Sequence, residues 1–332
     1  MFKEYLDFEI AISPASGRRY RVIVSGPGGD APPTTIALPP KTPRYQALAE
    51  ALARLDTNEA ALVELGRILF RTLFQGPIKD VYTRAQGQLK PEQGLRLRFN
   101  IDPTLGQVVA LPWEFLADPD QPGPMAMLDA PIVRYLPQQA VIPSLATTLP
   151  LKVLVTGAVT PPEPNVEQEL EEVRSALTGL GHHVDITVEP HLTKAKLREW
   201  LRRGFHVWHF IGHGGATKDG MTGTLLFEDA TGSSEAVTAT ELGSMLFRKG
   251  VRLIILDACN SAKLMSDTFR SVAPALIQAQ VPAVVAMQFT VPQEVTRAFA
   301  GEFYRALAQG FPIDACVTEG RVAVMNATGL RN

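Results

Sequence analysis

The sequence predicts an α/β fold, in which a mostly parallel sheet with helices on both faces follows a smaller α+β module. Two observations carry this prediction. From about residue 146 onward, short apolar runs alternate with stretches of helical periodicity, the pattern of parallel strands joined by crossover helices. Before that point, runs of alternating polar and apolar residues stand beside amphipathic stretches. We therefore expect an N-terminal module over residues 1–145 and a second domain over residues 146–332, divided in the proline-punctuated connector Pro137–Pro150.

The N-terminal module is expected to mix strands and helices. Ser13–Gly17 is rich in turn-forming residues and Gly26–Pro43 is rich in glycine and proline, so both are expected to be loops. Thr57 or Asn58 is suited to cap the second helix. The expected strands are Leu6–Ile12, Tyr20–Val24 and Leu95–Phe99, and the expected helices are Tyr45–Leu55 and Glu59–Phe74.

The second domain is expected to alternate strands with helices. Its apolar runs are short and bounded by glycine or polar residues, as in strands buried on both faces of a parallel sheet. Thr224–Asp229 interrupts this order and is expected to form an inserted hairpin. The expected strands are Leu151–Thr156, Val184–Val188, Phe205–Ile211, Val251–Leu256 and Ala283–Met287, and the expected helices are Val166–Leu180, Lys194–Arg203, Ala239–Phe247, Thr268–Ala279 and Gln293–Ala308.

The composition limits the class of function. Of the 332 residues, 45% are hydrophobic and 20% are charged, which is typical of a folded protein. A formal charge of −2 does not favour a polyanion-binding surface, so nucleic acid is not expected as a direct partner. No run approaches the roughly 20 apolar residues of a membrane span, and the N-terminus lacks the apolar core of a secretory signal. With only two cysteines, a reducing cytoplasm is the expected location.

His213 and Cys259 each follow an expected strand. The run Phe205–Ile211 leads into Gly212 and His213, and the run Val251–Leu256 leads into Asp257, Ala258 and Cys259. In open α/β sheets the carboxyl ends of the strands gather the chemistry. One strand end therefore offers a base and another offers a thiol, which is the arrangement of a cysteine hydrolase.

The chemistry of a thiol explains why both groups are needed. A thiol with an ordinary pKa of about 8.5 is mostly protonated at neutral pH, so a nucleophilic cysteine needs a base within hydrogen-bond reach. The two residues are 46 positions apart, about the separation of a caspase-type histidine from its cysteine. We expect His213 to be the general base and Cys259 the nucleophile, with the backbone amides of Gly214 and Cys259 forming the oxyanion hole.

The remaining candidate residues are expected either to line the substrate pocket or to have a purely structural role. Asp257 shares the face of Cys259 and can either form the floor of a pocket for a basic side chain or cap the helix that follows. The loop that begins at Gln288 is expected to wall the same pocket. Cys316 lies in an expected helix and is interpreted as a packing residue. His206, His209 and His213 lack a supporting carboxylate or cysteine cluster, so neither a metal nor another cofactor is expected.

At these residues the chain resembles the CHAT proteases, a branch of the caspase-like cysteine peptidases of clan CD. The resemblance rests on His209–Gly214 and Leu256–Ala262, and it extends to Val281–Gln288, Phe303–Gly310, Leu111–Leu116 and Val133–Tyr135. It implies a caspase-like sheet and a peptide-bond hydrolase with His213 as base and Cys259 as nucleophile. Distant relatives, the metacaspases and separases, place an aspartate two before the cysteine in a pocket for arginine or lysine, the position of Asp257.

The resemblance also implies a role and partners. CHAT proteases often act as regulated effectors in prokaryotic antiviral defence or cell death, so the expected partners are a protein substrate and a regulatory or sensor module. Family members usually continue into a further strand beyond the helix that matches Ala315–Met325, whereas this sequence stops at Asn332. The regulatory module is therefore expected either after Asn332 or on another chain.

Two other classes of protein are compatible with parts of the pattern. A non-catalytic caspase-like scaffold can keep the same fold to dock protein partners, and intact His213 and Cys259 argue against it. A nucleotide-binding α/β domain needs a glycine-rich turn that leads into a helix. Gly26–Gly29 leads instead into the proline-rich segment, so no phosphate cradle is expected.

Overall fold

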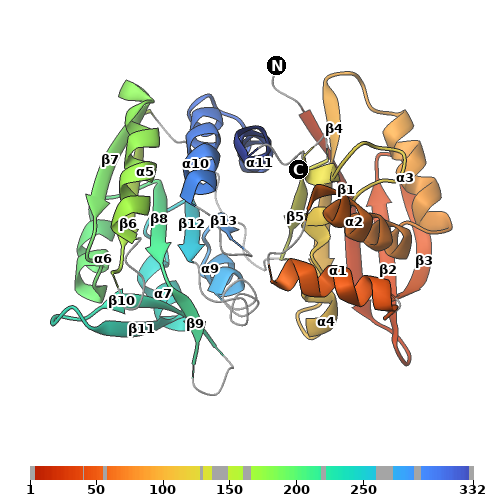
Figure 1. The fold of residues 1–332 in the computed structure, drawn as a ribbon, viewed down its shortest axis with the longest axis horizontal. Coiled ribbons are helices and arrows are strands. Elements are labelled where there is room, and N and C mark those ends of the chain that lie inside the picture. The colour runs from red at the N-terminus through yellow and green to blue at the C-terminus, as the bar shows by residue number, and fades with distance from the viewer. Residues whose placement is uncertain are drawn as a thin grey trace. The chain divides into compact units, whose positions relative to one another are not determined.

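The computed structural model of the chain describes residues 4–39, 41–54, 58–127, 130–136, 149–159, 166–217, 222–258, 272–287 and 293–328. The chain folds into two compact units (Figure 1). The first comprises Met1–Pro137 together with Asp314–Asn332, and the second comprises Gln138–Ile313. The last helix of the sequence thus belongs to the first unit, a placement that differs from the division expected between residues 145 and 146.

The first unit is built on a five-stranded mixed sheet with the order β3-β2-β1-β4-β5. β1 pairs antiparallel with β2 and parallel with β4, so the sheet combines a hairpin with crossover connections. Its strands are β1 (Glu4–Pro14), β2 (Arg19–Gly26), β3 (Gly29–Ala37), β4 (Gln93–Ile101) and β5 (Ile132–Arg134). Its helices are α1 (Pro43–Ala53), α2 (Glu59–Leu73), α3 (Pro77–Gly87), α4 (Gly106–Val109) and α11 (Ile313–Thr328), of which α11 begins at the last residue of the second unit.

The segment Gly26–Pro43 was expected to be a loop, and half of it is strand β3. β3 is an edge strand, and its pairing with β2 shifts register between Val22 and Val24. Pro32 and Pro33 fall at this irregularity, between the paired residues Ala31 and Thr34. Proline lacks an N–H and is tolerated in a sheet at edges and bulges, which is why this proline pair does not prevent the strand.

Helix α11 is attached to the first unit by charged side chains. Arg96 of β4 contacts Asp314 at 2.9 Å, and the carboxylate of Asp314 is only 8% exposed. Further along α11, the hydroxyl of Thr318 donates to the carbonyl of Ala126 at 3.3 Å. Asp314 also lies in the first turn of α11, where a negative charge interacts favourably with the helix dipole.

The second unit is built on a five-stranded sheet that is parallel throughout its described pairings, with the order β13-β12-β8-β6-β7. Its strands are β6 (Leu151–Gly157), β7 (Val184–Glu189), β8 (Val207–Gly212), β12 (Leu253–Ala258) and β13 (Ala283–Ala286). Its helices are α5 (Val166–Thr178), α6 (Lys194–Leu201), α7 (Ala239–Leu246), α9 (Ala273–Gln278) and α10 (Gln293–Ala308). Each strand lies within a few residues of its expected position.

Helices cover both faces of this sheet. α5 and α10 pack against each other on one face (Figure 1). On the other face, side chains of α6, α7 and α9 form one apolar cluster with alternate residues of the strands. The members of this cluster on the strands are Leu154, Trp208, Phe210, Ile254 and Leu256. The predicted α/β class, with a parallel sheet between two helical layers and a separate N-terminal module, is confirmed.

A small antiparallel sheet accompanies the second unit, with the order β11-β10-β9. Its strands are β9 (Gly214–Ala216), β10 (Gly223–Glu228) and β11 (Ser234–Thr238). The expected hairpin is present as β10 and β11, and β9 adds a third strand directly after His213. Among the described residues, no helix is both long enough and apolar enough to cross a membrane.

Candidate active site

His213 lies at the carboxyl end of the central strand β8, between β8 and β9. Its side chain is buried, with 4% of the residue exposed. Its backbone carbonyl accepts a hydrogen bond from the N–H of Leu226 in β10 at 2.9 Å. The next residue, Gly214, is buried and pairs with Leu225. The small sheet therefore holds the backbone of the candidate base.

Strand β12 runs beside β8 up to its last residue. Asp257 pairs with Ile211 and Ala258 pairs with Gly212, so both strands end at the same level. His213 follows Gly212 in the sequence, just as Cys259 follows Ala258. Cys259 itself lies outside the described residues, and so does Gln288.

Asp257, a candidate pocket residue, is deeply buried, with 2% of the residue exposed. By its pairing with Ile211 it occupies the face of the sheet that His209 also occupies, because residues two apart on a strand share a face. The expected alternatives for this carboxylate, a pocket floor or a helix cap, involve residues after Ala258 that the structure does not describe.

His209 lies within β8, four residues before His213 in the sequence, and contacts helix α10. Its Nδ1 atom is 2.9 Å from the hydroxyl of Tyr304, and the two rings stack at an interplanar angle of 28°. Burial lowers the pKa of His209 to about 3, and burial raises the pKa of Tyr304. Both side chains are therefore neutral near pH 7. The contact between them connects helix α10 to strand β8.

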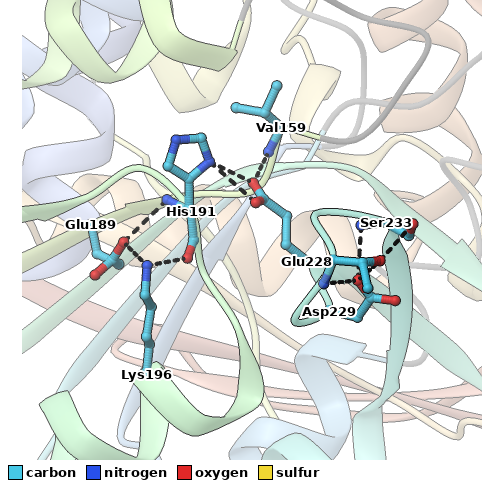
Figure 2. Close-up of polar contacts among 8 residues, drawn as sticks. Val159, Glu189, His191, Lys196, Glu228, Asp229 and Ser233 are labelled. Atoms are coloured by element: carbon cyan, nitrogen blue, oxygen red, sulfur yellow. Dashed lines mark hydrogen bonds and ion pairs between the residues drawn. The ribbon is translucent and has the colours of Figure 1, made fainter.

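A second polar cluster lies at the same carboxyl edge of the sheet (Figure 2). Glu228, the last residue of β10, accepts a hydrogen bond from the N–H of Val159 at 2.8 Å, and its two carboxylate oxygens lie 3.2 and 3.1 Å from Nδ1 of His191. Val159 comes two residues after β6, and His191 comes two residues after β7. The cluster thus connects the ends of two strands of the main sheet with the small sheet.

Sequence reasoning missed this cluster. The rule that singled out His213, a polar side chain just beyond a strand, also applies to His191 after β7. Glu228 carried no such signal, because a glutamate at the end of an expected hairpin is more often solvated. Its role becomes visible only from the placement of β10 against the loops after β6 and β7.

Cys316 and the other histidines offer no competing site within the described part of the chain. Cys316 on α11 is buried, and burial raises the pKa of its thiol to about 12, so it is protonated. Nδ1 of His206 accepts from the N–H of Lys152 at 3.1 Å. Across the described ranges, no group of three or more His, Cys, Asp and Glu side chains is placed to hold a metal ion.

Comparison with known proteins identifies the family. The chain matches the profile of the CHAT domain over residues 63–331, which is most of its length. It belongs to the CHAT domain family, as the resemblance of its motifs predicted. No curated protein sequence matches the chain.

One solved structure to which the chain is similar is the crystal structure of the Arg specific cysteine proteinase gingipain R. The identity is 14% and the TM-score is 0.44. The alignment covers 84% of this chain and 65% of the gingipain chain, so this chain spans slightly less than two thirds of that protein's length.

Proposed function

We propose that this protein is a cysteine endopeptidase with a Cys259–His213 dyad. The observation that supports it most is the parallel pairing of β8 with β12 up to Gly212 and Ala258, because His213 and Cys259 are the next residues on each strand. The burial of His213 at the end of β8 adds to this support. In a site from which water is largely excluded, the electrostatic interactions of a catalytic base with the reacting groups are stronger than in water.

In the proposed reaction, the sulfur of Cys259 gives its proton to His213 and attacks the carbonyl carbon of a peptide bond. The backbone N–H groups of Gly214 and Cys259 stabilise the oxyanion of the tetrahedral intermediate. The intermediate collapses as the C–N bond breaks and protonated His213 gives its proton to the leaving amine. Water, deprotonated by His213, then attacks the thioester, and release of the acid restores the thiol.

The substrate pocket is proposed to use Asp257 and the segment that begins at Gln288. Asp257 is buried at the end of β12, on the face of the sheet that His209 also occupies, and a carboxylate at this position can pair with a cationic side chain of the substrate. The proposed preference before the scissile bond is therefore arginine or lysine. A peptide library scanned at that position measures it, and Asp257→Asn should weaken the preference. A wild-type preference for leucine or for acidic residues would remove Asp257 from this role.

The proposed setting is that of a regulated effector in a prokaryotic defence or cell-death pathway. Membership in the CHAT domain family supports this setting, which includes a protein substrate, a regulatory or sensor module and action in the cytoplasm.

The test of the activity is cleavage of a fitting peptide or protein by the wild type and two variants. We expect Cys259→Ala to abolish cleavage and Cys316→Ala to retain it, because only the first thiol belongs to the proposed dyad. Cleavage that survives Cys259→Ala would end the assignment, and a wild type that cleaves no substrate would favour the scaffold interpretation instead.

A further inference from the structure

A groove lies between helices α6 and α7 of the second unit. Its volume is about 440 Å³, which is within the range of pockets that take small ligands. The two helices pack on the same face of the main sheet and share one apolar cluster, in which Leu201 of α6 and Met245 of α7 take part. Met245 also lines the groove, whereas the other side chains that line it are polar or charged.

Three cations line this groove: Arg198 and Arg202 of α6 and Lys249 in the turn 247–250 after α7. All three residues are exposed, and among the described residues none of their side chains takes part in an ion pair. Arg198 and Arg202 are four residues apart, so they lie on the same side of the helix, where like charges repel each other. An anion bound in the groove would offset this repulsion.

The acidic side chains of α6 and α7 are engaged by other groups. Glu199 of α6 contacts Arg203 at 2.8 Å. Glu241 of α7 accepts from the backbone N–H and the hydroxyl of Thr238, both at 2.8 Å, and contacts Lys194 at 3.1 Å. The hydrogen bonds from Thr238 and Lys194 lower the pKa of Glu241 to about 2. Neither helix therefore supplies a counter-charge for the three cations of the groove.

The turn 247–250 holds Lys249 beside the groove. The N–H of Lys249 donates to the carbonyl of Leu246 at 3.1 Å. Arg248 adopts a φ of 55°, in the left-handed region that favours glycine, and its guanidinium lies 5.1 Å from the centroid of the Phe247 ring. Phe247 is 45% exposed. The turn thus presents an exposed aromatic ring next to cations, a combination that is enriched at protein interfaces.

We propose that this groove docks an acidic peptide segment of a protein partner. Arg198 and Arg202 are about 6 Å apart along the helix axis, and side chains two residues apart in an extended chain are separated by about 6.6 Å. Alternate acidic residues of an extended segment therefore match the two guanidinium groups, which can each bind a carboxylate through two hydrogen bonds. Met245 and the exposed ring of Phe247 favour a peptide over a nucleic acid, and so does the formal charge of −2.

The cations of the groove lie away from the candidate dyad. Helix α6 leads into β8 and helix α7 leads into β12, so Arg202 and Lys249 precede the amino ends of these strands. His213, in contrast, follows the carboxyl end of β8. Docking is therefore separate from the proposed peptidase activity, and the two proposals can fail independently.

The test measures the binding of a fluorescein-labelled peptide, in which glutamate alternates with alanine, by fluorescence anisotropy. We expect the full chain to bind this peptide at least about tenfold more tightly than the same peptide with glutamine in place of glutamate. Arg202→Gln combined with Lys249→Gln should weaken binding by at least about fivefold. The matched control, Arg174→Gln combined with Arg297→Gln, removes the same charge from α5 and α10 on the other face of the sheet and should bind within about twofold of the wild type.

A further variant separates the groove from a general attraction to a basic surface. Ser244 is exposed and lines the groove, and its hydroxyl donates to the carbonyl of Thr240 within α7. Ser244→Tyr fills the groove and keeps every charge, so it should also weaken binding by at least about fivefold. Urea unfolding should give wild-type midpoints for these variants, because the substituted residues are exposed. Lower midpoints with unchanged peptide binding would show that the cations serve only the ends of the helices, and the proposal would be overturned.

Other occupants of the groove give different results. A single-stranded RNA that binds at least as tightly as the glutamate peptide, and is released by the Arg202 and Lys249 substitutions, would replace the peptide by a nucleic acid. Self-association in sedimentation that these substitutions abolish, without peptide binding, would replace it by a second copy of the chain. A wild type that binds the glutamate and glutamine peptides equally, or binds neither, would also overturn the proposal.

Discussion

The pair His209–Tyr304 makes the stability of the second unit depend on pH. His209 is buried, and its pKa is lowered to about 3 because burial disfavours the charged ring. In the unfolded chain the same ring titrates at about 6.5. Below that value the unfolded state binds a proton that the folded state does not bind. The stability is therefore fully present above pH 6.5 and is lost as the pH falls toward 3.

The size of this effect follows from the two pKa values. Each pH unit between them costs about 1.4 kcal/mol, so a shift from pH 7 to pH 5 should remove about 2 kcal/mol of unfolding free energy through His209 alone. The variant to compare is His209→Leu combined with Tyr304→Phe. Replacing both partners by apolar groups avoids leaving a buried hydroxyl without a hydrogen bond.

The assay is urea unfolding at both pH values, followed by tryptophan fluorescence, to which Trp208, fully buried on the same strand, contributes. Other titrating groups contribute equally to both proteins, so the difference between them isolates His209. The double variant should lose about 2 kcal/mol less than the wild type between pH 7 and pH 5. His182→Gln, at an exposed position before β7, is the control and should behave as the wild type. If the double variant and the wild type lose the same free energy, the reasoning from burial is refuted.

Two further predictions concern the first unit. The Cys316 thiol, with its pKa raised to about 12 by burial, should react with a thiol reagent only when the unit unfolds; stoichiometric labelling of Cys316 in the native Cys259→Ala variant would contradict this. Gly66→Ala should lower the free energy of unfolding by about 1–3 kcal/mol, because a Cβ there would lie 1.9 Å from the carbonyl oxygen of Phe115 on the neighbouring segment. Gly87→Ala on α3, where a Cβ meets nothing within 4 Å, should be neutral or stabilising; urea unfolding measures both variants.

The strands of the second unit could be predicted because their surroundings impose a simple pattern. A strand covered by helices on both faces must be mostly apolar, and β8 and β12 have that character apart from His209 and Asp257. The helices between them begin at recognisable caps, as at Thr193 and Thr238. In the first unit, Asn58 was one of the two residues proposed to cap α2, and its side chain accepts a hydrogen bond from the N–H of Ala61.

What could not be predicted depends on contacts between distant residues. β3 was taken for a loop because its proline pair is compatible with a strand only at an edge and a bulge, neither of which is visible before the sheet is assembled. β9 consists of Gly214, Gly215 and Ala216 and has no side-chain pattern at all. The attachment of α11 to the first unit rests on Arg96 and Asp314, which are 218 residues apart. Periodicity carries no information on such a pair.

The residues of the candidate site also fall into two groups, those that the sequence could predict and those that it could not. His213 and Asp257 could be selected because each belongs to the end of an apolar run, a local feature of the sequence. Glu228 could not, because its carboxylate becomes important only when β10 lies against the loops after β6 and β7.

The most direct test of the account measures how fast Cys259 is alkylated by iodoacetamide at neutral pH. The protein for this test carries Cys316→Ala, so that a single thiol remains. If His213 deprotonates this thiol, His213→Ala should slow alkylation by at least about tenfold, while His191→Ala should leave it within about twofold. Equal rates with and without the His213 imidazole would contradict the central claim that these two side chains act together.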